Sequence, residues 1–588
     1  MGWRGGIKKL NAIRTRKGNK RDRPPRMTIG FSLRAVRACL GPMELLNADA
    51  IIVGGGVGGC AAALALAEAG RTAIVVEEFS WIGGQLTSQA VPPDEHGWIE
   101  RFGCTARYRR FRDGVRAYYR AHYPLKPIHR NNPRLNPGNG WVSPLCHEPK
   151  VALAVLEAML APHVAADRIR ILSSHELKSA RNEGADRVAE VEVCDRLSGA
   201  ARRLAAPFFL DATENGDFLP LAGAEHVTGS EAAADTREPS AAATARPSNV
   251  QALSVCFVLD EGPEGADPVP PPPGYGRWRD YEPRLAPPWP GRLISWDGLN
   301  PRTMQPMRYH FDPHREKPGL FSGLWAFRRI IDRAQFDDGF FPSDLCLVNW
   351  PMIDYMEGDI LTCGAQERRS RIDEARQLSL AMVHWLQTEA PRPDGGRGWP
   401  RLRLRGDCTG SADGLAMAPY IRESRRIRAV TTIREQDVSA KFRPGDTLAE
   451  RYEDSVGIGY YRIDLHPSTG GDNYVDVPSL PFRIPLGSLI PVRMENLLPA
   501  AKNIGTTHIT NGCYRLHPVE WNVGEAAGEL VAFCLERGLS PRGVLCSSEQ
   551  RALFQSGLRD RGVELEWPEN LVLDDGDPHA HARPATAR

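Results

Sequence analysis

The sequence lacks any long apolar run. Nowhere among its 588 residues does a stretch approach the roughly 18 apolar residues that a membrane-spanning helix needs. We therefore expect no membrane partner. An apolar content of 42% and a charged content of 25% are typical of globular proteins in water. A chain of 588 residues is too long for one hydrophobic core, so two or more domains are expected.

The sequence also lacks C-x-x-C. Its twelve cysteines are scattered along the chain. This spacing gives no sign of the cysteine run that binds an iron–sulfur cluster, or of a zinc knuckle, and we expect no metal site. Scattered cysteines without a signal peptide fit a reducing compartment, so we expect a cytoplasmic protein.

Acidic residues are nearly missing from the first 42 residues. This segment holds twelve Lys or Arg residues and one acid, Asp22, so its charge is +11, which leaves −9 for the remainder of a chain with net charge +2. Such an arm suits nucleic acid, an anionic surface or a targeting role. We expect instead a disordered extension, or a start placed too far upstream of Met43. The negative remainder argues against a nucleic-acid groove, and no nucleic-acid partner is expected.

Glycine, in contrast, is concentrated in one place, the stretch VGGGVGGCAAALALAEAGRTAIVVEE that begins at Val53. β-Branched residues at 49–53 and 72–76 predict two buried strands. The Ala- and Leu-rich residues 60–69 between them predict a helix that ends at Gly70. The turn before this helix has the pattern G-x-G-x-x-G. The glycines of the pattern are Gly54, Gly56 and Gly59, and Gly58 is a further candidate for contact with the cofactor.

This order of strand, turn, helix and strand predicts a dinucleotide site. The glycines allow a tight turn and close approach of a pyrophosphate, and the helix N-terminus offers unpaired N–H groups and partial positive charge. Glu77, eighteen residues beyond Gly59, is placed to accept hydrogen bonds from ribose hydroxyls. A second G-x-G-x-x-G for a nicotinamide cofactor is missing, so the electron donor or acceptor stays open.

Further elements are expected along the chain from its periodicity and its turn residues. They are helices at 149–160 and 368–388, strands at 169–173, 188–195 and 206–211, a mobile loop at 231–249, an irregular Pro-rich segment at 263–291, an exposed loop at 395–406 and a frayed tail from 570.

Four further stretches resemble one family of flavoproteins. They are FFLDATENGDFLPLAGAEHVTG from residue 208, VNWPMIDY at 348–355, MAPYIRESRRI at 417–427 and NLLPAAKNIGTTHITNGCYRLHPVEWNVGEAAG at 496–528. The family is the FAD-dependent oxidoreductases of the glutathione-reductase-like, two-domain type, and the resemblance spans about residues 47–540. It implies FAD as the cofactor and a small-molecule substrate whose identity it leaves open.

The resemblance implies an α/β protein. A Rossmann-like FAD-binding domain, with a parallel sheet and helices, would be interrupted by an inserted mixed α+β substrate domain. The expected segments are an N-terminal extension at 1–42, the first part of the FAD-binding domain at 43–250, the substrate domain at 251–480, the C-terminal flavin element at 481–545 and a C-terminal segment with a frayed tail at 546–588.

The resemblance also indicates which residues contact FAD. Besides the first glycine loop and Glu77, they are Gly83, Gly84 and Gln85 in the GGQLT turn, and Asp211, Asp217, Asn503, Gly512 and Arg515. The alternative for GGQLT is a plain turn.

The helix expected from Pro518 bears on the chemistry. Its N-terminus would offer positive potential to the reduced, anionic flavin, and Arg515 would add to it, unless Arg515 makes a surface salt bridge instead. His508 and His517 are candidates to exchange a proton with the substrate, and each is equally suited to a structural role. Other candidates are Tyr420 and Glu520 as acid–base groups, and Arg422, Arg425 and Arg426 as either a carboxylate clamp or ion-pair partners.

The main hypothesis is hydride transfer between a small organic substrate and flavin N5. A flavin-dependent monooxygenase is the alternative, and a flavin-dependent protein that modifies or binds nucleic acid ranks below both. The sequence leaves the direction of electron flow and the oligomeric state open.

The basic arm should be dispensable. It lacks the apolar side chains whose burial offsets the entropy lost on ordering. A chain that begins at Met43 should therefore fold and bind FAD as well as the full chain does. Thermal melting and the visible flavin spectrum of the two proteins check this, and loss of solubility or of flavin on truncation would show that the arm belongs to the fold.

Overall fold

The computed structural model describes residues 43–263, 265, 267–314, 322–568 and 571. The expectations for the basic arm and for almost all of the tail lie outside these residues. The chain from Glu44 onward forms one unit. None of the helices in its described part combines the length and apolar character that a membrane crossing requires.

A five-stranded parallel sheet organises the cofactor-binding part. Its strand order is β23-β8-β2-β3-β4, and its strands are β2 (Ala50–Val53), β3 (Ala73–Val76), β4 (Ile169–Leu172), β8 (Phe208–Asp211) and β23 (Leu497–Pro499). The residues of β2, β3, β8 and β23 are buried on both faces, as a parallel sheet between two layers requires, whereas the edge strand β4 exposes Arg170. This is the predicted α/β, Rossmann-like architecture.

Helices cover one face of this sheet and a second sheet covers the other. Ala50 and Ile52 of β2 pack in one core with α1 (Val57–Glu68), α4 (Pro149–Ala165) and α13 (His517–Arg537). Ile51 and Val53, which alternate with them, pack in another core against the second sheet. That sheet has the order β1-β7-β6-β5, with strands β1 (Glu44–Asn47), β5 (His175–Glu183), β6 (Arg187–Asp195) and β7 (Ala201–Ala205).

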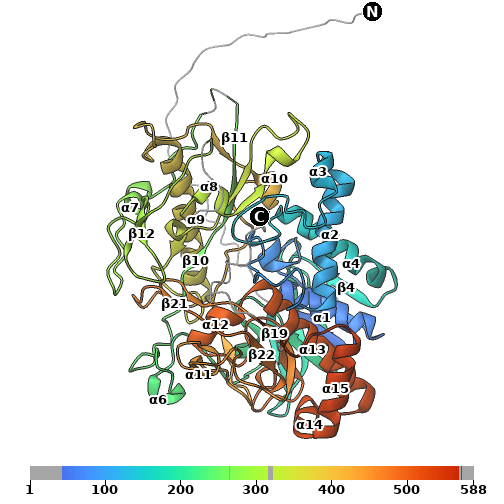
Figure 1. Cartoon of the computed structure of the whole chain (residues 1–588). Helices are drawn as coiled ribbons and strands as arrows, with labels where there is room; N and C mark the ends of the chain where they lie inside the picture. The colour runs from blue at the N-terminus through green and yellow to red at the C-terminus, as the bar shows by residue number, and fades with distance from the viewer. Residues whose placement is uncertain (1–42, 264, 266, 315–321, 569–570, 572–588) are drawn as a thin grey trace, which may run out of the picture. The chain divides into compact units, whose positions relative to one another are not determined.

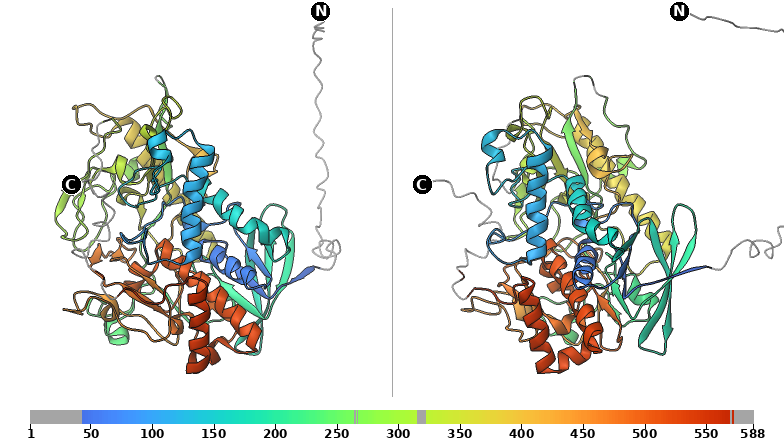
Figure 2. Two further views of the ribbon diagram at one scale, coloured as in Figure 1. Left: turned by 45° about the vertical axis from the view of Figure 1, so that its right-hand side comes forward. Right: turned by 90° about the vertical axis from the view of Figure 1, so that its right-hand side faces the viewer.

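The two helices that begin at the cofactor sheet, α1 and α13, lie side by side (Figures 1 and 2). Glycines make this possible. A Cβ added to Gly58 would lie 1.8 Å from the carbonyl oxygen of Ala500, and one added to Gly524 would lie 2.0 Å from that of Gly58. The prediction placed the start of the first helix at residue 60, but α1 begins at Val57, so Gly58 and Gly59 belong to its first turn.

A separate core, rich in tryptophan, lies under an antiparallel sheet and the long helix α9 (Ala365–Thr388), drawn in olive in Figure 1. The sheet has the order β14-β15-β11-β17, with strands β11 (Phe257–Glu261), β14 (Arg329–Ile331), β15 (Leu345–Val348) and β17 (Leu402–Leu404). The expectation of an exposed loop at 395–406 was wrong. Leu402–Leu404 pairs with β11, and the side chains of Trp399 and Leu402 are buried in this core.

Most of the remaining elements are short. The two-stranded pairs are β10 (Leu253–Ser254) with β16 (Asp354–Tyr355), β12 (Asp297–Leu299) with β13 (Pro306–Arg308), β9 (His226–Val227) with β18 (Arg426–Ile427), β19 (Ser455–Gly459) with β22 (Phe482–Pro485) and β20 (Ile463–Leu465) with β21 (Val475–Val477). The other helices are α2 (Ala106–His122), α3 (Pro127–Arg130), α5 (Phe218–Leu221), α6 (Ala233–Thr236), α7 (Tyr275–Arg279), α8 (Leu324–Phe327), α10 (Gly406–Thr409), α11 (Glu435–Val438), α12 (His508–Tyr514), α14 (Pro541–Cys546) and α15 (Ser548–Asp560).

The contact between α1 and α13 generates a prediction. Gly524→Ala should lower the free energy of unfolding by about 1–3 kcal/mol or more, because the new methyl group would overlap the backbone of Gly58. Gly276→Ala in α7 is the control, since a Cβ there meets open space and alanine favours a helix. Thermal melting checks both variants, and a Gly524→Ala protein as stable as Gly276→Ala would contradict the tight crossing.

Candidate functional site

A cavity of about 960 Å³ lies over the carboxyl ends of β2, β3 and β8, and we name it the large cavity. Ligands of open α/β sheets bind at this edge of the sheet. Its volume suits an extended dinucleotide. Residues from eight segments line it, and they include Val53, Gly54, Gly56, Val76, Glu77, Gly84, Ser88, Gln89, Ala212, Thr213, Glu214, Asp217, Arg368, Arg376, Met417, Ile421 and Arg425.

The first glycine loop presents its backbone to the large cavity. Gly54, with φ of +102°, passes so close to Ala212 that an added Cβ would lie 2.2 Å from its carbonyl oxygen. Gly56 is the N-cap residue of α1, and no side chain caps this helix. Gly58 and Gly59 are not among the lining residues and instead allow the close contacts of α1 with Ala500 and Gly54. The loop thus has the open, uncapped helix start that a pyrophosphate needs.

Glu77 lies at the end of β3 on the wall of the large cavity. Its Oε2 accepts from the N–H of Gly55 and its Oε1 from the N–H of Phe79, both at 2.8 Å. Burial raises the pKa of Glu77 to about 8, against the opposing effect of the two N–H groups. The position agrees with a ribose contact, which stays a prediction.

The two aspartates after β8 differ in their placement. Asp217 lines the large cavity and pairs with Arg368 at 3.0 Å and Arg425 at 2.8 Å. Asp211 is fully buried and does not line it; burial raises its pKa to about 7, although Thr213 donates two hydrogen bonds to its Oδ1. The side chain of Asn503 donates to the backbone oxygen of Asp211 at 3.0 Å. Asn503 therefore links the end of β8 to the C-terminal flavin element.

The GGQLT turn contacts both the first loop and the last helix. Gly83 and Gly84 have positive φ, and the N–H of Gly83 donates to the oxygen of Gly55 at 2.7 Å. Gly84 lines the large cavity. Gln85 instead donates from Nε2 to Oε2 of Glu520 at 2.8 Å and to the backbone oxygen of Arg515 at 3.2 Å, while its buried Oε1 has no hydrogen-bond partner among the described residues.

His517 is the first residue of α13, so Pro518 is the second residue of the helix and not the first, as predicted. The N–H of Asp94 donates to its Nδ1 at 3.1 Å, and its buried Nε2 has no partner in the described part of the chain. Burial lowers the pKa of His517 to about 3, so the ring is neutral near pH 7. It does not line the large cavity.

Arg515 is buried, which rules out the surface salt bridge considered for it. One guanidinium nitrogen donates to the hydroxyl of Tyr420 at 2.8 Å, and another binds the carboxylate of Asp464 at 3.2 Å. Tyr420 follows Pro419 and precedes Ile421, which both line the large cavity, so Arg515 lies just behind that wall. Gly512 packs against β20, where an added Cβ would lie 2.9 Å from the backbone nitrogen of Asp464.

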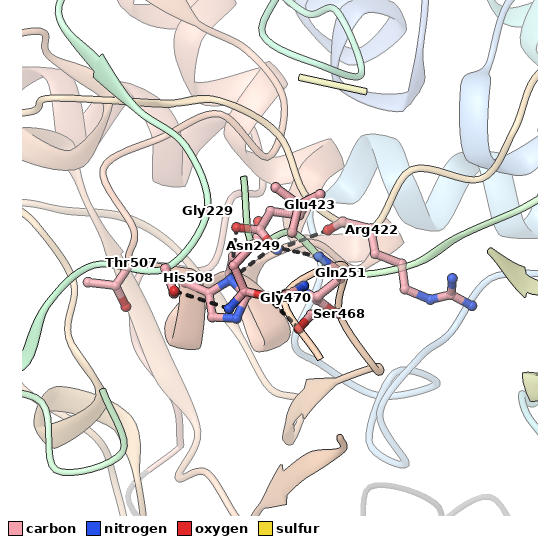
Figure 3. A network of polar contacts seen from close by, with 12 residues as sticks. Gly229, Asn249, Gln251, Arg422, Glu423, Ser468, Gly470, Thr507 and His508 are labelled. Atoms are coloured by element: carbon pink, nitrogen blue, oxygen red, sulfur yellow. Dashed lines mark hydrogen bonds and ion pairs between the residues drawn. The ribbon is translucent and has the colours of Figure 1, made fainter. Parts of the chain in front are cut away.

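The structure connects His508 to Arg426 through Glu423, and His508 does not line the large cavity. It begins α12, and Thr507 caps this short helix. Figure 3 shows its Nδ1 against the carboxylate of Glu423, 2.9 Å from both oxygens. Burial disfavours its charged form, but Glu423 outweighs this and raises the pKa of His508. His508 and Glu231 line another cavity of about 300 Å³, which we name the middle cavity.

Three arginines of the segment 417–427 are all buried and paired with acids, although this segment is not a helix. Their partners are Asp354 for Arg422, Asp217 for Arg425, and Glu423 and Glu231 for Arg426. In Figure 3 the guanidinium of Arg422 points away from His508. These contacts agree with the ion-pair alternative for the three arginines.

Sequence reasoning missed His466, which lies between β20 and β21. Its Nδ1 is 2.6 Å from Oδ2 of Asp354. His466 lines the middle cavity and also a cavity of about 110 Å³, which we name the small cavity. Asp354 lies in VNWPMIDY, one of the segments that resemble the family. The two residues are 112 positions apart, so no local spacing announces the pair.

The large cavity generates a prediction for Glu77. Glu77→Ala should weaken FAD binding by about tenfold or more, because a carboxyl group on the cavity wall is lost. Glu78→Ala is the matched control, since Glu78 lines the same cavity and pairs with Arg196 at 3.2 Å. FAD titration of the apoproteins, followed by flavin fluorescence, checks this, and equal affinities of the two variants would contradict the ribose contact.

Comparisons with known proteins address the family. The model of the family "FAD dependent oxidoreductase" matches residues 49–553. A search of curated proteins gives no match.

Among solved structures, the chain is similar to a geranylgeranyl bacteriochlorophyll reductase-like protein from Thermoplasma acidophilum, with 10% identity, a TM-score of 0.30 and coverage of 88% of this chain and 85% of that one. It is similar to a myxobacterial FAD-dependent chondrochloren halogenase at 15% identity, with a TM-score of 0.23 over 39% of this chain and 45% of that one. The glycerol-3-phosphate dehydrogenase from Bacillus halodurans, complexed with FAD, gives 14% identity and a TM-score of 0.22 over 39% and 43%. The chain thus spans less than half the length of the halogenase and of the dehydrogenase.

The family match covers most of the chain, and the uncapped glycine loop, the acid at the end of β3 and the volume of the large cavity fit the same cofactor. The chain belongs to the FAD-dependent oxidoreductases, and FAD is its cofactor.

Proposed function

We propose that this enzyme transfers a hydride between a small organic substrate and FAD, and that the substrate occupies the small cavity. The observation that carries the proposal is a histidine, oriented by a buried carboxylate, on the wall of that cavity. When bound, FAD supplies N5 as the hydride acceptor or donor. The residues around the small cavity have to hold the substrate, exclude water and exchange a proton with the substrate.

Two walls of the small cavity lead to the start of α13. Arg328 pairs with Asp94 at 3.1 Å, and the N–H of Asp94 donates to His517, the first residue of that helix. On the other wall, Asp464 binds Arg515. The small cavity is therefore next to the helix start that the resemblance assigns to the flavin.

The lining of the small cavity favours a compact, partly polar substrate. Aromatic side chains form much of the wall, and charged groups interrupt it. The aromatic residues are Tyr309, Phe327, Trp350, Tyr461 and Tyr474, and the charged ones include Arg328, Arg462, Asp464 and Asp476. A volume of about 110 Å³ accommodates few heavy atoms, which supports a small molecule over an extended chain.

His466 has the geometry of a general base. Asp354 is buried and also accepts from the Ser254 hydroxyl at 2.6 Å and pairs with Arg422 at 3.0 Å. Burial favours the neutral form of Asp354, but Arg422 and His466 outweigh it and lower its pKa. The ionised carboxylate holds the proton of His466 on Nδ1, which leaves Nε2 to exchange a proton with the substrate. His517, with a pKa of about 3, is too weak a base for that task near pH 7.

The reaction of the reduced enzyme with oxygen tests the reaction class. The purified protein should be yellow, with the visible spectrum of bound flavin. Stopped-flow mixing of the reduced enzyme with oxygen should return oxidised flavin in one phase, without a transient species. A transient species, with oxygen incorporated into a product, would favour the monooxygenase instead.

His466→Asn should slow reduction of the flavin by its organic substrate by about 10²- to 10⁴-fold, because the proton acceptor is lost. Asp354→Asn should act in the same direction, because the ring then loses its fixed tautomer. His122→Asn, at an exposed histidine of α2, is the control. Stopped-flow absorbance measures the rates, and reduction by dithionite should be equal in all variants. Unchanged substrate rates in His466→Asn would exclude the role.

A further inference from the structure

Gly56 and Gly84 present their backbone to the cofactor site, and we name these two residues the glycine cradle. The carboxylate of Glu214 covers the glycine cradle. Its Oε1 lies where Cβ atoms added to Gly56 and Gly84 would be only 2.8 and 2.5 Å away. This oxygen is buried and has no hydrogen-bond partner among the described residues. Glu214 itself lines the large cavity. An acidic side chain therefore extends over the two glycines that keep the cradle open.

The position of Glu214 is one that attracts an anion. Gly56 is the N-cap residue of α1, no side chain caps this helix, and its first turn holds no acid. A helix start without these groups has unpaired N–H donors and partial positive charge. In loops of this pattern, the pyrophosphate of a dinucleotide occupies this position. Glu214 and the pyrophosphate are both anionic, so their charges oppose occupancy of the cradle by both.

A buried cation holds Glu214 in place. The Nζ of Lys502 is fully buried, binds the other carboxylate oxygen of Glu214 and lies 3.4 Å from Oε2 of Glu520 in the first turn of α13. Burial opposes the charge of Lys502, but the two carboxylates outweigh it and raise its pKa. Lys502 is therefore charged, and a buried charge of this kind requires an anionic partner at all times.

We propose that Lys502 is the cation that binds the phosphates of FAD, and that the Glu214 carboxylate competes with them for the α1 start and for Lys502. The α1 start and Lys502 would hold the pyrophosphate, and the Glu214 side chain would turn away from both. Lys502 then has an anionic partner in either case. The proposal rests on FAD as the cofactor, which the family match shows, and is independent of the hydride transfer and of the role of His466.

A different role for Glu214 predicts the opposite result. If Glu214 stayed over the cradle and accepted a hydrogen bond from a hydroxyl of FAD, Lys502 would only hold Glu214 in position. Removal of the carboxylate would then weaken FAD binding. The sign of the change in affinity thus separates the two roles.

Glu214→Gln should bind FAD about tenfold more tightly than the unaltered enzyme, because a competing anion is removed. Glu176→Gln is the matched control, since it removes a carboxylate from another part of the same cavity wall and should change the affinity far less. The apoproteins are titrated with FAD, and FAD release from the diluted holoenzymes is followed by flavin fluorescence. Weaker binding by Glu214→Gln, or equal tightening in the control, would overturn the proposal.

Lys502→Met completes a double-mutant cycle with Glu214→Gln. A direct contact with the phosphates predicts that Lys502→Met weakens FAD binding by about 30-fold or more in both backgrounds. If the loss disappeared in the Glu214→Gln background, Lys502 would act only through Glu214, and the assignment would be wrong. Melting of the apoproteins identifies a misfolded variant, in which case Lys502→Arg replaces it and should retain FAD, and the sign of the Glu214→Gln effect still decides.

Discussion

The close approach of α1 and α13 is the constraint on which the site depends. Their backbones meet at Gly58 and Gly524, where no side chain fits between them. This contact brings two helix N-termini to one edge of the parallel sheet. Positive potential from both helices then overlaps in a small volume, which suits a cofactor with a diphosphate in its middle and a reducible ring at one end. The rest of the chain supplies walls to this arrangement.

Burial of charge is the second theme of the structure. Charged side chains around the site lie in the interior, and most have a partner of opposite charge, as for Arg422 with Asp354 and Arg426 with Glu423. Such pairs contribute little to stability compared with apolar packing, but the loss of one partner is expensive because the other stays buried. The pairs therefore hold segments distant in sequence in one geometry. The segment 417–427 shows this, because it has no helix or long strand and is held by its ion pairs.

The sequence predicted the cofactor-binding part well for a local reason. Strand, glycine turn, helix and terminal acid follow one another within about 30 residues, so the spacing itself carries the geometry, and β2, α1 and β3 form as expected. The prediction of an exposed loop at 395–406 was wrong because Leu402–Leu404 pairs with β11, a strand far away in the sequence, and composition does not reveal such pairing. The pairing of His466 with Asp354 could not be predicted for the same reason. Proximity in sequence to the last helix favoured His508, yet α12 directs it to Glu423, whereas His466 meets Asp354 only through the pairing of distant strands.

The crossing of α1 and α13 also limits how enzymes of this architecture can diverge. Positions such as Gly58 and Gly524 accept no larger residue, so the crossing offers evolution almost nothing to adjust. Under the proposed function, new substrates would be accommodated by the side chains that border the small cavity, which can change in size without moving the two helices. Phe327 and Tyr474 are such positions. Proteins that share this helix crossing can therefore keep one mode of cofactor binding while the residues that line the small cavity change one at a time.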